Sequence, residues 1–580
     1  MSGGEENSCV EQVKLVQNEG IFAMRVRGYL YFGSGWHARR DDLENHMAQM
    51  NVSRRSFLAA STAAAGAIVL ALGGCGGGGN KEQGAAEGKA VEGGTLTAAI
   101  AYSTANSYTP VGVSAAAVMA AYCHTCEALY DLDYTTYETY PALAAGEPEK
   151  VSETEYHIAL REGAKYSDGS DVTPADVVAS IQVEMENALY APFLSFIDKV
   201  TEEGNGVCVT LKYPAESLLK CRLATCRVFP KGTPQEDLDK GTFLSTGPWV
   251  ITSCNFDAGG AVDFEPNPNY NGSKPATAAA MHWDIIVDET SRTQYLTEQT
   301  AMVMESVPAA NVDLVKQSGA TVETLDSFSL PFLMFNTVKK PFDDYRVRQA
   351  LFYAIDVEKL ISNQLAGFAK PLTCFLPENH ANYHQAATVF TYDPEKAKAL
   401  LEEAGVKDLK LELMVNDRWP KDLAPQIKEN WDAVLGDGAV TLNVCEVDWA
   451  AFNDPKDAKY DILLSPGDPS CFGNDPDLWM SWWYGDNIWT SGRTFWQHSD
   501  KKTFDKLQDL MQQAREATGD AQQELFNQCF DLLAEQVPLY PLMHRQVSTA
   551  WWPNLIAGFK PVTTTGLYFL GASCTEESAK

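Results

Sequence analysis

Basic residues are scarce in this sequence, and their scarcity limits which partners the protein can have. The 580 residues contain 45 Lys and Arg but 77 Asp and Glu, which gives a formal net charge of −32. Phosphate backbones bind to basic surfaces, so we expect no nucleic acid partner. The same charge disfavours contact between the folded chain and an anionic membrane. With 45% hydrophobic residues the chain can still form a large core, and its length predicts two or three structural units.

The motifs of common enzyme classes are also missing. We find no GxSxG, no HExxH, no GxxxxGK[ST] and no GxGxxG after a predicted strand. The nine histidines are scattered without the spacing of metal ligands, so we expect neither a metal site nor a cofactor. Carboxylate pairs are common in so acidic a chain and do not by themselves indicate catalysis. We therefore expect a protein that is not an enzyme, with an exported hydrolase as the alternative from another class.

No apolar run reaches the length of a comfortable membrane span, and the one run that is present follows two arginines. Ser53–Leu58 reads SRRSFL, with Arg54 and Arg55 in the pattern of a twin-arginine export signal, and the apolar stretch 58–72 comes directly after it. Leu72-Gly73-Gly74-Cys75 resembles the lipobox of bacterial lipoproteins. That resemblance implies a signal over residues 47–74, cleavage before Cys75 and lipidation of its thiol.

A lipid at Cys75 would hold the protein on the outer, periplasmic side of the cell membrane, because each buried methylene of an acyl chain stabilises the anchor. The glycine-rich residues 75–92 would then form a flexible tether. An uncleaved signal anchor is the alternative. Residues 1–46 do not fit a twin-arginine signal. We expect translation to begin at Met47 or Met50, with an upstream extension of the gene model.

The 13 cysteines are dispersed rather than grouped as in a zinc site. Cys123 and Cys126 form one CxxC within a predicted helix, and no second pair follows at zinc-site spacing. Cysteines of this kind commonly fill cores. A metal site and, because export permits oxidation, a disulfide remain the alternatives. The cysteines that such a disulfide would use are Cys208, Cys221, Cys226 and Cys254.

Three separated segments have distinctive sequences. Leu330–Asp356 begins with an apolar run, Phe332–Phe335, which predicts a buried strand, and continues with apolar residues spaced as in an amphipathic helix. His157–Gln182 predicts a strand, an Asp-Gly turn and a helix capped by Thr173. Ser245–Gly272 predicts a hairpin around its Gly-Gly pair and ends in Asn-Pro-x-Tyr. Further strands and helices alternate to the end of the chain, which indicates an α/β protein.

In wording, order and spacing, these three segments resemble the family 5 extracellular solute-binding proteins, the peptide-binding receptors of ABC importers. The resemblance covers the chain from about Gly93 to its end. It implies a two-lobed periplasmic-binding-protein fold of type II, in the large peptide-binding class, with two crossing hinge strands near Ser327–Leu333 and Leu542–Thr549. Lobe I would comprise residues 93–330 with an inserted subdomain, lobe II residues 331–545, and residues 546–580 would return to lobe I.

The resemblance also implies a function and partners. The protein would bind peptides between its lobes and deliver them to an ABC permease and ATPase complex, and we expect it to act as a monomer. Nickel chelates, haem and oligosaccharides are the alternative ligands, since relatives of this fold carry them.

The best candidate site lies in Tyr460–Asp486, where a predicted buried strand leads into a loop rich in proline, glycine and aspartate. In peptide-binding relatives an aspartate here pairs with the α-ammonium of the peptide, which implies that role for Asp468, after Gly467. Pro466 stands where such receptors often have an aromatic residue, so Asp475 is a rival anchor. Both carboxylates could instead be ordinary turn residues.

Aromatic residues follow this loop, and a second loop could face it. Trp479 and Trp482 are candidate ligand contacts, although packing in the core or at the rim is their alternative role. Tyr102 and Ser103, after the first predicted strand, are candidate contributions from the first lobe.

Overall fold

The computed structural model describes residues 22–26, 29–33, 87–104, 108–113, 115–447, 449–452 and 459–580. The chain forms two units, Met1–Glu82 and Gln83–Lys580. In the first unit β1 (Phe22–Val26) and β2 (Tyr29–Gly33) pair as an antiparallel hairpin. The predicted signal and tether, with Arg54, Arg55 and Cys75, lie outside the described residues. No helix in the described part of the chain is long and apolar enough to span a membrane.

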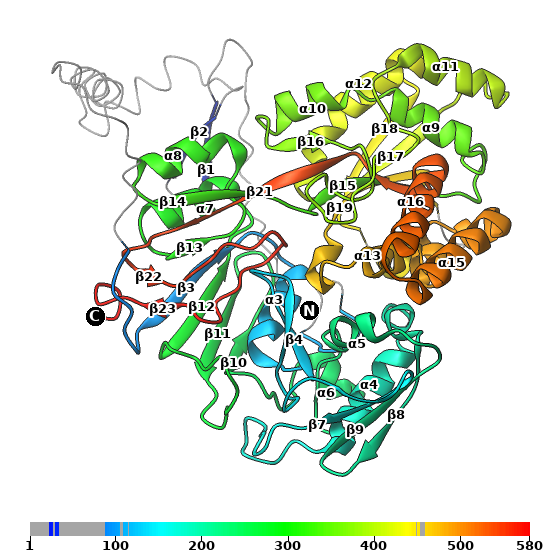
Figure 1. The fold of residues 1–580 in the computed structure, drawn as a ribbon. Helices are drawn as coiled ribbons and strands as arrows, with labels where there is room; N and C mark the ends of the chain where they lie inside the picture. The colour runs from blue at the N-terminus through cyan, green and yellow to red at the C-terminus, as the bar shows by residue number, and fades with distance from the viewer. Residues whose placement is uncertain are drawn as a thin grey trace, which may run out of the picture. The chain divides into compact units, whose positions relative to one another are not determined.

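The first lobe of the second unit is built on an eight-stranded mixed sheet (Figure 1). Its centre is parallel, because β3 pairs in the same direction with β12 and β13, and most of the residues of β3 are buried. Along the sheet the strands are β10 (Trp249–Cys254), β11 (Ala261–Pro266), β12 (Ala280–Ile285), β3 (Thr95–Ile100), β13 (Val303–Met304), β21 (Met543–Trp551) and β14 (Thr321–Asp326), and β16 (Ala369–Pro371) pairs with β21. The hairpin predicted around Gly259 and Gly260 is confirmed as β10 and β11.

A smaller four-stranded antiparallel sheet with a helix is inserted between β3 and β10. Its strands, in order, are β6 (Glu149–Ser152), β7 (Glu155–Ala159), β9 (Gly206–Leu211) and β8 (Ile197–Glu203). Helix α4 (Pro174–Glu186) begins as predicted, because Thr173 and Asp176 form a reciprocal capping box and Pro174 occupies the first turn. Helix α5 (Glu216–Leu223) follows β9.

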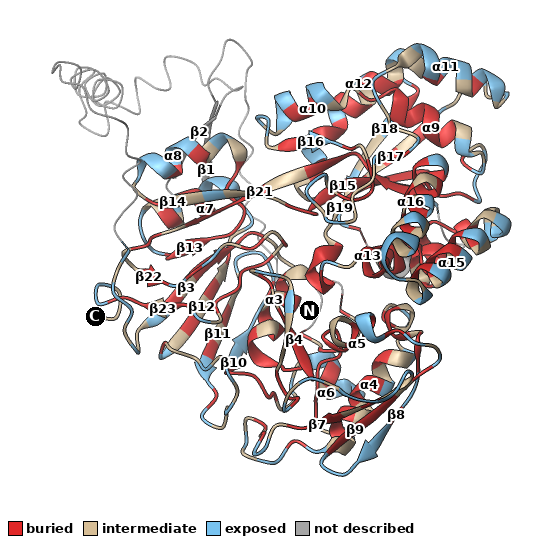
Figure 2. Cartoon of the chain, in the orientation of Figure 1, coloured by how far each residue is buried: buried red, intermediate tan, exposed pale blue. Residues whose placement is uncertain are grey.

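The second lobe is built on a five-stranded sheet, and its strands are mostly buried (Figure 2). All six residues of β15 are buried, as expected for a strand that is covered on both faces. The strand order is β18 (Val440–Cys445), β17 (Leu411–Asn416), β19 (Ile462–Gly467), β15 (Leu330–Phe335) and β20 (Leu539–Pro541). The α-helices of this lobe are α9 (Tyr345–Tyr353), α10 (Val357–Gln364), α11 (Pro394–Glu403), α12 (Ala424–Leu435), α13 (Pro476–Tyr484), the short α14 (Trp496–Ser499), α15 (Lys501–Glu516) and α16 (Gly519–Gln536).

The chain passes between the two large sheets twice. The first passage runs from β14 to β15 through residues 327–329, and the second runs from β20 into β21. Strand β21 belongs to both lobes, because its first residues pair with β16, which follows α10 of the second lobe, and its later residues pair with β14. The predicted two-lobed α/β fold with two crossing strands is thus confirmed.

Several sequence predictions need correction. The helix predicted to contain both Cys123 and Cys126 is α3 (Ala116–Thr125), which ends before Cys126, and β4 (Tyr130–Asp133) follows. The helix does not continue through Glu127, because its N–H donates a hydrogen bond to the hydroxyl of Thr246 and its buried carboxylate pairs with Arg161. The alternative of a disulfide among Cys208, Cys221, Cys226 and Cys254 is contradicted, since all four thiols are free.

Candidate functional site

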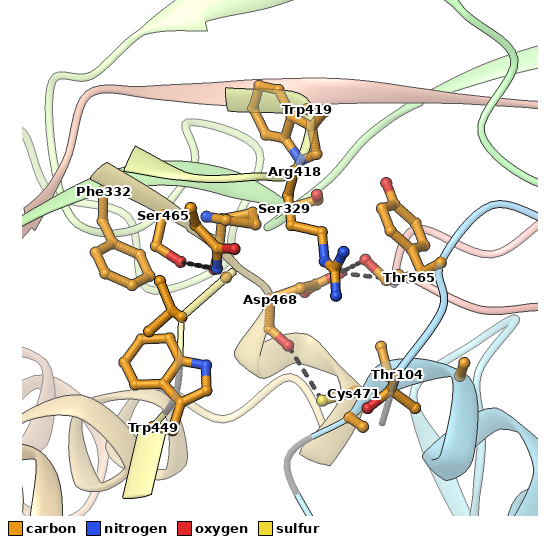
Figure 3. Close-up of a pocket in the computed structure, with 18 of the residues that line it drawn as sticks. Thr104, Ser329, Phe332, Arg418, Trp419, Trp449, Ser465, Asp468, Cys471 and Thr565 are labelled. Carbon is orange, nitrogen blue, oxygen red and sulfur yellow. Dashed lines mark hydrogen bonds between the residues drawn. The ribbon is translucent and has the colours of Figure 1, made fainter. Parts of the chain in front are cut away.

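A cavity of about 290 Å³ lies where three strands of the two lobes end. Tyr102 and Ser103 follow β3 of the first lobe, Arg418 follows β17, and Asp468 follows β19. Strands β17 and β19 are parallel neighbours, so their carboxyl ends open on the same edge of the sheet. The sequence prediction that ligand contacts follow β19 therefore coincides with a cavity to which both lobes contribute (Figure 3).

Asp468 is half-buried at this edge, and both of its carboxylate oxygens accept hydrogen bonds. Oδ1 accepts from the backbone N–H and the hydroxyl of Ser470. Oδ2 accepts from the backbone N–H of Thr565 at 2.7 Å and from its hydroxyl at 2.9 Å. Burial raises the pKa of Asp468 above the usual aspartate value, although these four hydrogen bonds lower it in part.

Gly467 lies in the cavity wall, at a position where a larger residue does not fit. A Cβ at this position would lie 2.6 Å from Cζ2 of Trp483 and 3.0 Å from Cε1 of Phe332. The glycine thus lets β19 approach the aromatic side chains beneath it while its backbone faces the cavity.

Tyr102 and Ser103 line the cavity from the first lobe. The hydroxyl of Tyr102 lies 3.3 Å from Nη1 of Arg545, in the crossing strand β21, and 3.4 Å from the hydroxyl of Ser306. These contacts fix the position of the tyrosine ring relative to the crossing strand.

Asp475 and Trp479 do not line this cavity. Asp475 is the N-cap of α13 and accepts a hydrogen bond from the guanidinium of Arg222 at 3.2 Å. Trp479 is almost fully buried, stacks on Phe328 with ring centroids 4.0 Å apart, and donates its indole N–H to the carbonyl oxygen of Gly473. Trp482 does line the cavity, where its ring packs against Phe472. Of the five residues proposed in this segment or its loop, three therefore meet at the cavity: Gly467, Asp468 and Trp482.

Several lining residues were not expected from the sequence. Arg418 follows β17 just as Asp468 follows β19. The expectation that ligand contacts follow strand ends, which identified Asp468, therefore also applies to Arg418. Figure 3 shows the guanidinium of Arg418 directed toward Asp468 and Thr565. Its Nη2 lies 3.4 Å from a carboxylate oxygen of Glu446, which also lines the cavity. Trp449, Trp489 and Arg493 complete an aromatic and cationic wall for which the sequence offered no local pattern.

Among the described residues, no group of three or more His, Cys, Asp or Glu side chains could hold a metal ion. The cavity instead combines two carboxylates, of Glu446 and Asp468, with arginines, hydroxyl groups and tryptophan rings. Such a lining can hold a molecule that has an amine, an acid and an apolar part.

This fold and cavity define the class of two-lobed solute-binding proteins. Residues 138–493 match the bacterial extracellular solute-binding proteins, family 5 Middle, and the chain belongs to this family. It is 28% identical over 262 residues to the glutathione-binding protein GsiB of Escherichia coli (strain K12), covering 43% of this chain and 50% of that protein. It is 26% identical over 344 residues to a dipeptide-binding protein of Pseudomonas aeruginosa, covering 57% and 61%. The chain thus spans about half the length of the curated relatives it matches.

Solved structures share the fold over most of the chain. The dipeptide-binding protein of Pseudoalteromonas sp. SM9913, in complex with Met-Leu, matches 83% of this chain and 100% of its own with a TM-score of 0.69 at 19% identity. DppA of Helicobacter pylori, in complex with the peptide STSA, matches 84% and 99% with a TM-score of 0.72 at 19% identity. NikA of Staphylococcus aureus, in complex with Ni(L-His)2, matches 83% and 100% with a TM-score of 0.67 at 18% identity. At these identities the likeness establishes the fold.

Proposed function

We propose that this protein is the receptor of an ABC importer, binding short peptides in the cavity between its lobes and presenting them to a membrane permease and its ATPase. Its own role is binding, without catalysis. One observation carries the proposal: Asp468 and Arg418 face the same cavity from adjacent strand ends (Figure 3). A free peptide carries an ammonium at one end and a carboxylate at the other, and these two side chains complement that pair of charges.

The amine would bind at Asp468. A half-buried carboxylate attracts an ammonium more strongly than an exposed one, and the hydrogen bonds from Ser470 and Thr565 hold it in place. The α-carboxylate would bind at Arg418, whose pair with Glu446 at 3.4 Å is long and exposed enough to be exchanged for a ligand.

Closure of the lobes would follow from ligand binding, since residues of both lobes line the cavity. Tyr102 and Thr565 belong to the first lobe, whereas Arg418 and Asp468 belong to the second. A ligand that touches all four gains contacts in the closed arrangement that an open one lacks, so binding shifts the population toward closure. The closed lobes would then form the surface that the permease recognises.

The cellular setting of the proposal depends on the sequence before residue 87. The twin arginines Arg54 and Arg55 support export, and Cys75 supports a lipid anchor on the outer face of the membrane. We propose that residues 93–330 and 546–580 form lobe I, with residues 331–545 as lobe II, and that the mature protein is a monomer.

Calorimetry with modified dipeptides tests the proposed function. The protein is stripped of bound ligand by unfolding and refolding, and is then titrated with Ala-Leu, N-acetyl-Ala-Leu and Ala-Leu-amide. We expect one site for Ala-Leu and a loss of at least about tenfold in affinity for each modified form, because each removes one partner of a charged pair. Absence of binding by any unmodified dipeptide, or equal affinity for all three forms, would overturn the proposal.

A further inference from the structure

Arg493 is a buried cation in the wall of the cavity. It ends the short helical turn Trp489–Arg493, only 7% of it is exposed, and it lines the cavity. Its guanidinium carbon lies 4.1 Å from the ring centroid of Trp489 and 4.6 Å from that of Trp449. The aromatic faces attract the positive charge but cannot accept the in-plane hydrogen bonds of the guanidinium.

No carboxylate or carbonyl oxygen in the described part of the chain accepts a hydrogen bond from Arg493, and its buried Nε has no hydrogen-bond partner. The other four buried arginines of that part all have oxygen acceptors. Arg222 and Arg227 pair with aspartates at 2.7 Å, and Arg292 and Arg348 donate to backbone carbonyl oxygens. Arg493 alone among these five faces a cavity instead of an acceptor.

Burying a cation without hydrogen-bond acceptors is unfavourable in free energy. An anion that binds beside the cation offsets this unfavourable term. Arginine remains charged at neutral pH even here, where burial lowers the pKa of Arg493 to about 9. Its flat, fixed guanidinium matches a carboxylate that can accept two parallel hydrogen bonds. None of the described residues fills this role, so the cavity leaves room for an acceptor that enters with the ligand.

Arg493 stacks on Trp449, which is not among the residues proposed to bind the peptide ends. Figure 3 shows Trp449, on which Arg493 stacks, on the side of Asp468 away from the guanidinium of Arg418. Trp449, Trp482 and Trp489 make this side of the cavity aromatic. A side chain that extends along these rings would bring its terminal group to Arg493.

We propose that Arg493 is a second anion-binding subsite, which takes the side-chain carboxylate of an acidic residue in the peptide. The inference rests on the proposed function and adds to it a preference among peptides. Ligands with one ammonium and two carboxylates would be favoured over ligands with a neutral side chain of the same shape.

Matched peptides test the inference without altering the protein. The wild-type protein is titrated by calorimetry with Ala-Glu and Ala-Gln, and in the reverse order with Glu-Ala and Gln-Ala. We expect the acidic peptide of at least one pair to bind at least about tenfold more tightly than its amide, which has the same size. Equal affinities within both pairs would overturn the inference while leaving the proposed function intact.

Two variants then assign the preference to Arg493. Arg493→Met keeps a long side chain beside the tryptophans but has no charge, so we expect the preference for Glu to vanish while the affinity for the Gln peptide changes by less than about threefold. Arg493→Lys keeps the charge and is expected to retain part of the preference. Unfolding curves should show that Arg493→Met is at least as stable as wild type, since it removes an unpaired buried cation.

The outcomes separate the two proposals. If Arg493→Met weakens the Glu and Gln peptides by the same factor, then Arg493 binds the α-carboxylate or supports the wall, and the inference is overturned. If wild-type protein binds none of the four peptides, the proposed function fails together with the inference.

Discussion

The carboxylate of Asp468, directly after β19, accepts two hydrogen bonds from Thr565, which lies 97 residues further along the chain, beyond the crossing strand β21. With residues 546–580 in lobe I, as we propose, a residue that holds the ligand also joins the two lobes. The two roles are compatible. Lobe closure orients the carboxylate of Asp468, and the same carboxylate can then accept further hydrogen bonds from a bound ammonium.

Replacing Asp468 should weaken peptide binding through both roles. For Asp468→Ala we expect at least about a tenfold loss in affinity for Ala-Leu, because the ammonium would be left without a partner. Thr565→Val is the matched control. It removes one hydroxyl donor to the carboxylate but keeps the backbone N–H of residue 565 and the charge of Asp468, so its loss in affinity should be clearly smaller than that of Asp468→Ala.

N-acetyl-Ala-Leu distinguishes the two roles by calorimetry. If Asp468 binds the ammonium, then Asp468→Ala should cost much less for the acetylated peptide than for the free one. An equal cost for both peptides would assign Asp468 to lobe closure alone.

Peptide affinity should fall on acidification, and at a higher pH than an exposed aspartate would give. Burial raises the pKa of Asp468 above 3.8, and the ammonium pairs only with the ionised form. Full affinity is therefore expected above this raised pKa, with loss as the pH falls through it, before exposed aspartates are protonated. Calorimetric titrations from pH 7 to pH 4 measure this change. A constant affinity over the whole range would contradict it.

Gly467→Ala should disturb the cavity wall. The new methyl group would lie 2.6 Å from Trp483 and 3.0 Å from Phe332, and the rings of both residues are buried. We expect a loss of about 1–3 kcal/mol in the free energy of unfolding, together with weaker peptide binding. Gly146→Ala is the control, because a Cβ there meets nothing within 4 Å. Equal unfolding curves for the two variants would contradict this prediction, because they would show that Trp483 and Phe332 can move aside without loss of stability.

Arg222 should stabilise the junction between α5 and α13. Its fully buried guanidinium donates to Asp477 at 2.7 Å and to Asp475 at 3.2 Å. We expect Arg222→Met to lower the free energy of unfolding by about 3 kcal/mol in denaturant titrations, because it leaves buried carboxylate charge less compensated.

The control for Arg222 lies in the same helix. Lys220 pairs with Glu147 at 2.8 Å on the surface, so Lys220→Met should cost less than about 1 kcal/mol. A similar loss for both variants would contradict the assigned role of Arg222.

Local sequence patterns predicted those elements whose signals are local. The cap at Thr173, the hairpin at Gly259 and the buried run of β15 each depend on a few adjacent residues, and each is confirmed. Helix α13 was missed although Asp475 and Pro476 form the same kind of start, because proline, glycine and aspartate around them indicated a loop.

The site could be predicted only in part, for a physical reason. Asp468 and Arg418 both follow strands, so predicting the strands also identifies both residues as candidate ligand contacts. Arg493 has no such signal. Its importance comes from the lack of a hydrogen-bond acceptor among the described residues around it, and that depends on how distant segments pack.

The ligand that the protein carries when purified tests the account most directly. The protein is isolated under native conditions and denatured, and the released molecules are identified by mass spectrometry, with the mass of the intact complex measured beforehand. We expect about one short peptide per protein, enriched in acidic residues. A metal chelate, a tetrapyrrole or an oligosaccharide in that stoichiometry would contradict the central claim.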